Sequence, residues 1–470
     1  MVFSSLIFLL FFLTALYVCY FIVPRRWRWL RNCVLLVFSL FFYRCGGADY
    51  LPLLLASILI NYLGGLLAAS ERPALRKLGL WGAAALGLGL LGWFKYAGFA
   101  AENLAALGLP VEMPQIVLPI GISFFTFQGL SYVIDVYRGD ARCQENPLYV
   151  ALYVALFPQL VAGPIVRYTT VEEEIVQRNE SLEEFSQGVV RFLFGLGKKM
   201  LLANAMGEIA DGVFAQSPET MALSLAWVGA AAYTFQIYFD FSAYSDMAIG
   251  LGRMFGFHFL ENFNYPYISK SIAEFWRRWH ISLATWFRDY VYIPLGGSRC
   301  SMGRNIRNMA VVWLLTGLWH GAAWTYVTWG GMMLVLLAGE KYCWGRGLSR
   351  LPGPVQHLYT IVLVMFSMVM FRSSGIGYGL SYFQSMAGLG GRPDGQAVYY
   401  LLEYWPEWIA CVLASLPVKV WAQRSLERRE GLLPALTLEW GPKLAALGLL
   451  GLSYTKLATG SFNPFIYFQF

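Results

Sequence analysis

Charged side chains are scarce in this 470-residue sequence. Only 13% of its residues are Asp, Glu, Lys or Arg, whereas 57% are hydrophobic and 17% are aromatic. A soluble domain of this length needs far more polar surface. The composition therefore indicates a polytopic membrane protein, and no separate soluble domain is expected.

Cysteine and histidine are also scarce, and neither forms a metal-binding pattern. The seven cysteines are scattered, without a C-x-x-C pair or a zinc spacing. The four histidines include no H-E-x-x-H motif, and neither His280 nor His320 has an adjacent carboxylate or a second histidine one helical turn away. No metal site is therefore expected.

Two further absences narrow the classes of function. No G-x-S-x-G nucleophile elbow is present, so the chain lacks the signature of a Ser-His-Asp hydrolase. The net charge of +7 comes largely from short loops, without the basic and aromatic surface that binds nucleic acid. Nucleic acid is not expected as a partner.

Apolar segments near the length of a spanning helix recur along the whole chain. They cover residues 3–23, 31–42, 50–69, 78–94, 116–136, 148–166, 189–205, 222–250, 308–337, 357–371, 408–420 and 444–457. They predict an all-α polytopic membrane protein with roughly a dozen transmembrane helices, plus interfacial or re-entrant helices.

Basic residues mark three of the connecting loops. The first loop has Arg25, Arg26, Arg28 and Arg31, the second has Arg72, Arg76 and Lys77, and the third has Arg424, Arg428, Arg429 and Lys443. Loops rich in Lys and Arg face the cytoplasm. Both termini are therefore predicted to lie outside.

The segment 272–290 predicts one amphipathic helix. At about 100° per residue, its aromatic and apolar side chains fall within an arc of roughly 120°, with charged residues opposite and His280 at the border. The segment is too charged to span a bilayer, so it should lie at an interface or dip into the protein. A lipid-surface anchor, with His280 as an ordinary polar residue, and a functional His280 both fit.

His320 is the only side chain between residues 308 and 337 that can be charged at neutral pH. At about 1.5 Å per residue this run is too long for one perpendicular span, so a bend is expected near Gly317 and Gly321. Burial at that depth favours a neutral imidazole, which can accept a proton. A general base and a satisfied structural histidine both remain possible.

Asp240 and Asp246 lie six residues apart in an apolar run, so a helix places them on different faces. Each is costly enough within a membrane to require a partner. They are not expected to act together as an acid and base.

The chain ends in an aromatic tail, FIYFQF. From Gly460 this tail, if extended, reaches on the order of 35 Å, enough to bring the hydroxyl of Tyr467 toward the membrane centre. An interfacial aromatic belt is the alternative interpretation.

Three runs resemble the membrane-bound O-acyltransferase family. They are YFDFSAYSDMAIGLG at 238–252, EFWRRWHISLATWFRDYVYIPLGG at 274–297 and GLWHGAAWTYVTWG at 317–330. More specifically, they resemble the membrane subunit of bacterial alginate O-acetyltransferase and its relatives in cell-wall polysaccharide acetylation. The run SDMAIGLGRMFGF differs from relatives that attach D-alanine to teichoic acids, which favours the acetyl branch.

The resemblance implies a funnel-like bundle with a histidine buried in mid-membrane. One domain is expected over 1–470, with scaffold helices at 1–107, a catalytic core at 116–345, C-terminal helices at 355–459 and the aromatic tail at 460–470. The family's nearly invariant histidine maps onto His320, and its second polar position, His or Asn, maps onto His280. Its terminal F-I-Y-type acyl acceptor motif maps onto Tyr467.

The implied activity is transfer of an acetyl group from a cytoplasmic thioester to an extracytoplasmic acceptor, for O-acetylation of a cell-surface polysaccharide such as alginate. The donor is acetyl-CoA or an acyl-carrier thioester, with no bound cofactor. Candidate donor-binding residues are Trp276, Arg277, Arg278, Arg299 and Arg304, although ordinary cytoplasmic loop charge also explains the arginines.

The expected partner is an extracytoplasmic, esterase-like acetyltransferase with a Ser-His-Asp site, and the expected location is the bacterial plasma (inner) membrane. Two alternatives stay open. One is transfer of D-alanyl or another acyl group to teichoic acid or cell wall from an acyl-carrier protein. The other is a transporter of an acylated intermediate, which should show an internal repeat that the sequence lacks.

Overall fold

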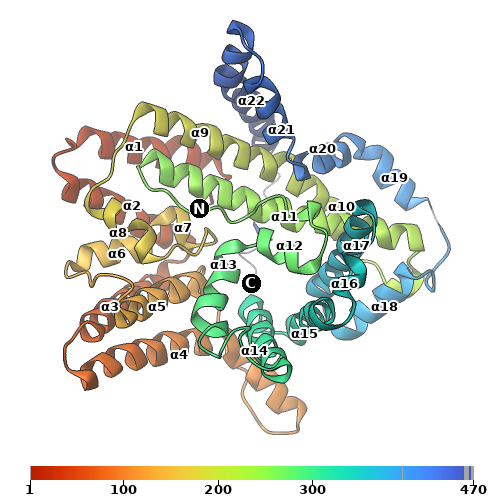
Figure 1. Cartoon of the computed structure of the whole chain (residues 1–470), viewed down its shortest axis with the longest axis horizontal. Coiled ribbons are helices and arrows are strands. Elements are labelled where there is room, and N and C mark those ends of the chain that lie inside the picture. The colour runs from red at the N-terminus through yellow and green to blue at the C-terminus, as the bar shows by residue number, and fades with distance from the viewer. Residues whose placement is uncertain (1, 394, 460–464, 467–470) are drawn as a thin grey trace. The chain divides into compact units, whose positions relative to one another are not determined.

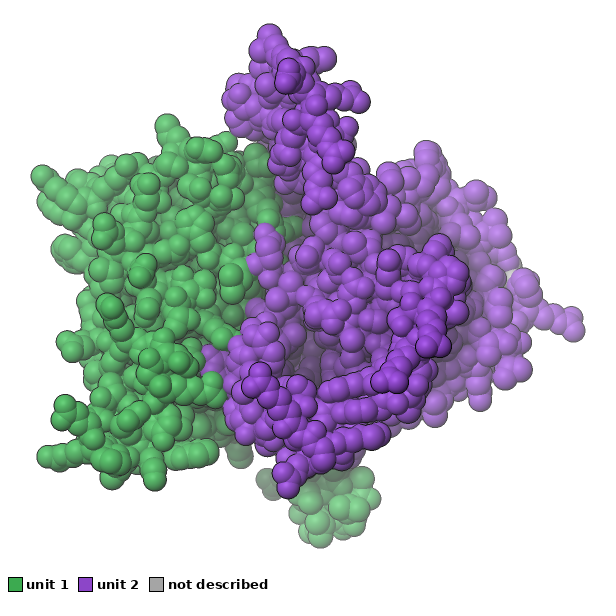
Figure 2. Space-filling model, viewed as in Figure 1, with its two compact units in different colours: residues 1–192, 244–260, 467–469 green, residues 193–243, 261–466, 470 purple. Residues whose placement is uncertain are grey.

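The computed structural model describes residues 2–393, 395–459 and 465–466. Within these residues all regular elements are helices and no strand occurs, which confirms the predicted all-α class (Figure 1). The chain divides into two compact units, coloured separately in Figure 2. Of the described residues, unit 1 holds 2–192 and 244–260, and unit 2 holds 193–243 and 261–466.

Unit 1 contains the amino-terminal helices. They are η1 (Ile7–Phe12), α1 (Leu13–Ile22), α2 (Arg28–Gly46), η2 (Ala48–Tyr50), α3 (Leu51–Ala68), α4 (Pro73–Ala106), α5 (Ile122–Arg138), α6 (Pro147–Ala155), α7 (Phe157–Leu160) and α8 (Tyr168–Val176). Helices α3, α4 and α5 pack on one another. Glycine makes this close approach possible, because a Cβ at Gly79 would lie 2.5 Å from the backbone nitrogen of Ala68.

A buried polar group, here called the arginine cluster, ties the loops of unit 1 together. Its members are Tyr20, Arg28, Arg31, Arg178 and Glu180. Glu180 accepts a hydrogen bond from Tyr20 at 2.5 Å and one from Arg31 at 2.6 Å, and it also pairs with Arg28. Since a buried carboxylate is stable only when paired and hydrogen-bonded, the cluster holds α1 and α2 against the loop before α9 (Leu182–Gly197).

Unit 2 contains the remaining helices, apart from α9 and α11 (Leu223–Met254), which have residues in both units. They are η3 (Lys198–Ala203), α10 (Asn204–Phe214), η4 (Pro218–Thr220), η5 (Pro266–Ile268), α12 (Ile272–Arg278), α13 (Ile281–Phe287), η6 (Arg288–Tyr292), α14 (Met302–His320), α15 (Trp324–Gly339), η7 (Glu340–Trp344), α16 (Gly345–Leu348), α17 (Gly353–Arg372), α18 (Ile376–Met386), α19 (Gln396–Glu403), α20 (Trp405–Ser415), α21 (Val418–Glu427) and α22 (Leu432–Ala458).

The bend predicted near Gly317 and Gly321 is present, because α14 ends at His320 and α15 begins at Trp324. The two helices pack closely through glycine. A Cβ at Gly317 would clash with the carbonyl oxygen of Tyr326, and one at Gly321 would clash with its ring. The α14–α15 pair therefore has little freedom to shift where His320 lies.

Four predicted segments were wrong in detail. One of them, 408–420, is interrupted at Leu416, between α20 and α21. The segment 272–290 is not one helix but α12, α13 and η6. The segment 148–166 is interrupted at Leu156, whose ψ of 114° is not helical, and helix within 116–136 begins only at Ile122. Among the described residues, α3, α4 and α17 are long and apolar enough to cross a membrane. The count of roughly a dozen spans stays a prediction.

Candidate active site

His280 lies at a sharp bend between α12 and α13. Its φ of 45° is left-handed, a region that Asn, Asp and His enter more readily than most residues. The bend removes His280 from the border position that the single helical wheel predicted. Its side chain is buried, with the ring 4.6 Å from that of Phe241. It is therefore not the interfacial side chain of a surface anchor.

Asn262 fixes the orientation of the His280 ring. The Asn262 Oδ1 atom accepts hydrogen bonds from the backbone nitrogen and hydroxyl of Ser282, at 3.1 Å and 2.9 Å, which identifies it as the amide oxygen. His280 Nδ1 lies 3.2 Å from the same oxygen and therefore carries the proton. In this tautomer, Nε2 is the nitrogen that can accept a proton or a hydrogen bond.

His320 is the last residue of α14 and is surrounded by aromatic rings. Its ring centroid lies 5.1 Å from that of Trp319 and 5.2 Å from those of Trp329 and Phe371. Only 3% of the residue is exposed. These rings come from α14, α15 and α17, so packing of three helices sets its position.

The structure brings the two predicted histidines together. Their ring centroids are 6.4 Å apart, although the residues are 40 positions apart in the sequence. We call this group, with its neighbours Asn262, Trp319, Trp329 and Phe371, the histidine centre. Imidazole rings in an aromatic enclosure are suited to accepting and releasing a proton away from water. The third predicted catalytic residue, Tyr467, lies outside the described residues.

Glu340 of η7 caps the first turn of α12. Its two carboxylate oxygens accept hydrogen bonds from the backbone nitrogens of Ile272 and Ala273, at 2.7 Å and 2.9 Å. Ser271 adds a side-chain cap by accepting from the Glu274 nitrogen at 3.0 Å. A carboxylate stabilises the positive end of a helix, so these bonds fix α12 to η7 and support the bend at His280.

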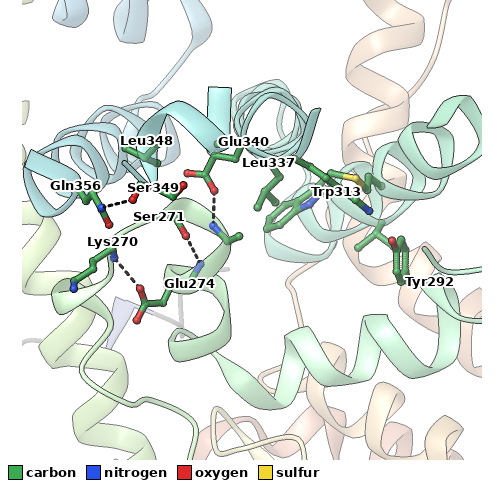
Figure 3. A pocket seen from close by; sticks show the side chains of 15 residues that line it. Lys270, Ser271, Glu274, Tyr292, Trp313, Leu337, Glu340, Leu348, Ser349 and Gln356 are labelled. Carbon is green, nitrogen blue, oxygen red and sulfur yellow. Dashed lines mark hydrogen bonds between the residues drawn. The ribbon is translucent and has the colours of Figure 1, made fainter. Parts of the chain in front are cut away.

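A cavity of about 710 Å³ lies beside this cap, within unit 2 (Figure 3). Its wall includes Lys270, Glu274, Tyr292, Trp313, Glu340 and Lys341. The Trp313 ring is 6.1 Å from that of Trp329, which in turn contacts His320. The Trp313 ring of the cavity wall therefore lies next to the Trp329 ring of the histidine centre.

None of the donor-binding residues predicted from the sequence lines this cavity, although Arg278 and Trp276 each contact a residue that does. Arg277, Arg299 and Arg304 are exposed, and Arg278 pairs with Glu274 at 2.9 Å. Trp276 packs against Trp313 and Trp329. Among the described residues that line the cavity, none belongs to this predicted set, and the lysines Lys270 and Lys341 are present instead. The predicted donor-binding roles stay predictions.

Both aspartates of α11 have the partners that their burial requires. Asp240 pairs with Lys199 at 2.5 Å, and Asp246 pairs with Arg191 at 2.6 Å. The expectation that they do not act together is consistent with these different partners.

Sequence reasoning missed Asn262 and Phe371. Asn262 lies in a loop 18 residues before His280, and Phe371 lies near the end of an apolar helix. Neither has a local pattern that distinguishes it from other loop amides or core rings. Only the tertiary fold reveals them.

Comparisons with known proteins place the chain in a family. Residues 144–385 match the model of the MBOAT, membrane-bound O-acyltransferase, family. The chain is 39% identical, over the full length of both proteins, to "Probable alginate O-acetylase AlgI" of Azotobacter vinelandii. It is 30% identical to the "Peptidoglycan O-acetyltransferase" of Helicobacter pylori, over all of this chain and 98% of that protein. Identity to the "Teichoic acid D-alanyltransferase" of Bacillus subtilis is 29%, over 54% of this chain and 67% of that protein.

These matches establish the class, an acyltransferase enzyme of membranes. The chain belongs to the membrane-bound O-acyltransferase family. The family match, over residues 144–385, contains both histidines of the centre.

Proposed function

We propose that this enzyme moves an acetyl group from a cytoplasmic thioester, such as acetyl-CoA, to an extracytoplasmic acceptor for O-acetylation of a cell-surface polysaccharide. The observation that carries the proposal is the pair of buried histidines, 6.4 Å apart between ring centroids. The relatives matched over their full length are named for acetylation of alginate and of peptidoglycan. The D-alanyl relative is matched over about half of this chain, which favours acetyl transfer.

In the proposed reaction His320 is the general base. It takes the proton of the attacking hydroxyl, for which we propose Tyr467, while that oxygen bonds to the acetyl carbon. The carbon–sulfur bond then breaks, and the proton passes from His320 to the leaving thiolate. His280 is proposed to position His320 and the reacting groups, because Asn262 holds its ring and the two imidazole centroids lie 6.4 Å apart.

The segment that carries most of the cavity wall is rich in basic residues, although the wall itself contains two lysines and two glutamates. Residues 270–350 contain ten Lys and Arg against three Asp and Glu. Coenzyme A carries several phosphate charges, and an excess of Lys and Arg marks the cytoplasmic side of a membrane protein. We place the donor at the cavity beside Lys270 and Lys341, with its acyl arm directed past Trp313 toward His320.

The decisive test compares His320→Ala with His258→Ala in cells that lack other surface acetyltransferases. His258 is an exposed histidine bonded to Glu174, so it controls for loss of an imidazole outside the centre. At equal protein level, His320→Ala should lower polysaccharide acetylation about 10²-fold or more, whereas His258→Ala should keep wild-type acetylation. Wild-type acetylation in His320→Ala would overturn the assignment.

Tyr467→Phe tests the acceptor separately, because it removes one oxygen and keeps the ring. Loss of acetylation with unchanged binding of acetyl-CoA supports acyl transfer to Tyr467. Full activity would instead favour direct transfer to an acceptor from outside the chain. Supplying an acylated carrier protein in place of acetyl-CoA distinguishes the D-alanyl alternative.

We further propose that the acetyl group passes to an extracytoplasmic, esterase-like partner with a Ser-His-Asp site. The sequence has no G-x-S-x-G elbow of its own, so transfer to a polymer requires chemistry from another protein. The location proposed is the bacterial inner membrane, with both termini outside.

A further inference from the structure

Phe465 and Ile466, the two described residues of the carboxy-terminal tail, are buried in unit 2. Phe465 is 1% exposed and Ile466 is 9% exposed. Ile466 belongs to the same hydrophobic core as Trp279 and Phe371, although it is only four residues from the end of the chain. This part of the tail therefore packs as core and not as an interfacial belt.

A buried ion pair holds these two residues. The Asp240 Oδ1 atom lies 2.5 Å from Lys199 Nζ, and both side chains are 2% exposed. The second carboxylate oxygen, Oδ2, accepts a hydrogen bond from the backbone nitrogen of Ile466 at 2.7 Å. Lys199 Nζ also lies 4.6 Å from the centroid of the Phe465 ring, a cation–π distance.

The tail contributes a donor to a carboxylate that is removed from water. A buried carboxylate requires several donors, and loss of the Ile466 bond would leave Oδ2 desolvated without that donor. Docking of the tail and burial of the ion pair therefore stabilise each other. The π-helical turn η3 carries Lys199, and π-turns are frequent at functional sites.

The ion pair is also linked to the histidine centre through one peptide bond. Phe241 follows Asp240 in α11, and its ring contacts that of His280. Ile466, which bonds to Asp240, therefore lies beside the turn of α11 whose Phe241 ring contacts His280.

We propose that Lys199 and Asp240 form a latch that sets the register of the tail, so that the residue after Ile466 is the one offered to the histidine centre. Both are positioning residues, since they act through the tail. Consecutive α-carbons lie about 3.8 Å apart, so fixing Ile466 limits the reach of the next residue, Tyr467. The part of this proposal that concerns register rests on the proposed acceptor role of Tyr467. The part that concerns docking of the tail by the latch does not depend on that role.

The test exchanges the two charges, with the variant Lys199→Asp/Asp240→Lys in the full-length protein in nanodiscs. The exchange retains an ion pair but places an ammonium donor, and no carboxylate, opposite the Ile466 nitrogen. Backbone amides of 465–466 should exchange with deuterium about tenfold faster or more, while α14 and α15 exchange as in wild type. Acetyl transfer should fall in parallel.

Phe465→Ala provides a second test that leaves the ion pair intact. It should also accelerate exchange in the tail, because it removes a buried ring from the docked segment. Tyr454→Ala is the matched control, since Tyr454 is 53% exposed on α22, and it should leave tail exchange unchanged.

The outcomes separate the latch from the proposed function. Faster tail exchange together with loss of acetyl transfer supports both. Faster tail exchange with full acetyl transfer supports docking by the latch and refutes the acceptor role of Tyr467. Wild-type tail exchange in both the charge-exchanged variant and Phe465→Ala overturns the latch, whatever happens to activity.

Discussion

The arginine cluster of unit 1 and the histidine centre of unit 2 are both buried polar groups, yet they differ in kind. In the cluster, one carboxylate, Glu180, is paired with Arg28 and Arg31 and held in its charged form. In the centre, His280 and His320 lie among indole and phenyl rings, and Nδ1 of His280 bonds to the neutral amide of Asn262.

The two groups of polar side chains therefore differ in what they can do. A carboxylate between guanidinium groups is fixed in one protonation state, so it holds chain segments together but cannot exchange a proton readily. An imidazole in an aromatic enclosure can gain and lose a proton during a reaction. Burial of polar groups alone therefore does not distinguish a structural cluster from a candidate active site.

The largest effect on stability is expected from Glu180→Gln. The substitution keeps the size of the side chain but leaves buried guanidinium groups without their counter-charge. It should destabilise the folded state by about 3–5 kcal/mol, measured as a lower thermal midpoint in detergent. Acetyl transfer per folded molecule should be unchanged, because no member of the arginine cluster belongs to the histidine centre.

Glu184→Gln is the matched control for this change. Glu184 pairs with Arg253 at 2.5 Å, but its side chain is 28% exposed, so its loss should cost no more than about 1 kcal/mol. If Glu180→Gln lost acetyl transfer but kept wild-type stability, the arginine cluster would act in the reaction and not in stability. The proposed difference between the two regions would then be wrong.

Acid pH provides an independent check of the cluster. Burial raises the pKa of Glu180, but hydrogen bonds from Tyr20 and Arg28 and the charges of Arg28 and Arg178 outweigh it, so the net pKa lies below its usual value. The stabilisation is complete above the ordinary carboxyl pKa and is lost as the pH falls through the lowered value. Below about pH 4 the thermal midpoint of wild type should fall more steeply than that of Glu180→Gln.

In the histidine centre, His280 should affect activity more than stability. His280→Ala should lower kcat about 10²-fold, because His320 and the reacting groups lose the imidazole that packs beside them. His280→Asn should lose less stability than His280→Ala, because Asn adopts the positive φ of 45° more readily than Ala does. Thermal midpoint and kcat, measured on both variants, separate backbone strain from loss of the imidazole. Equal kcat for His280→Ala and wild type would remove His280 from the mechanism.

A smaller effect is expected from the glycine contact that holds α14 against α15. Gly317→Ala places a methyl group against the Tyr326 carbonyl oxygen, and the helices must separate to accept it. This should cost about 1–3 kcal/mol of stability and lower activity by moving His320. Gly331→Ala is the matched control, since its Cβ meets no atom within 4 Å, and it should be neutral or slightly stabilising. Equal stability of the two variants would show that packing of α14 on α15 does not position His320.

The sequence was sufficient for the all-helical class, the family, the bend before α15 and the need of Asp240 and Asp246 for partners. These features depend on local composition, on helix length or on long motifs. The resemblance also gave His or Asn at position 280, and the left-handed backbone supplies a physical reason for that choice, since both residue types tolerate positive φ.

The bend at His280 could not be predicted from the helical wheel. The aromatic arc is real, since Phe275, Trp279 and Leu283 are all buried. A period of 3.6 residues assumes a continuous helix, and it gives no signal for a bend that depends on distant groups. Here the groups are Asn262, which bonds to the first turn of α13, and Glu340, which caps α12 from 68 positions away.

The smallest effect is expected at the donor cavity, where Lys341→Gln keeps a donor for Asn305 but removes the charge. Lys341 Nζ donates to Asn305 Oδ1 at 2.7 Å, and the amide of Gln can replace that bond. Loss of one cation should raise KM for acetyl-CoA about two- to fivefold with little change in kcat, because the charge acts on donor binding and not on the histidine centre.

Arg277→Gln is the informative comparison, because Arg277 is exposed on α12 and is not among the residues that line the cavity. If Arg277→Gln raises KM and Lys341→Gln does not, the sequence-based prediction for the arginines is correct and the donor enters elsewhere. If only Lys341→Gln raises KM, the donor binds at the cavity beside Trp313. Trp313 would then lie beside the donor and Trp329 beside His320, so these two indole rings would line the path of the acyl arm, whereas the arginine cluster would have no part in donor binding.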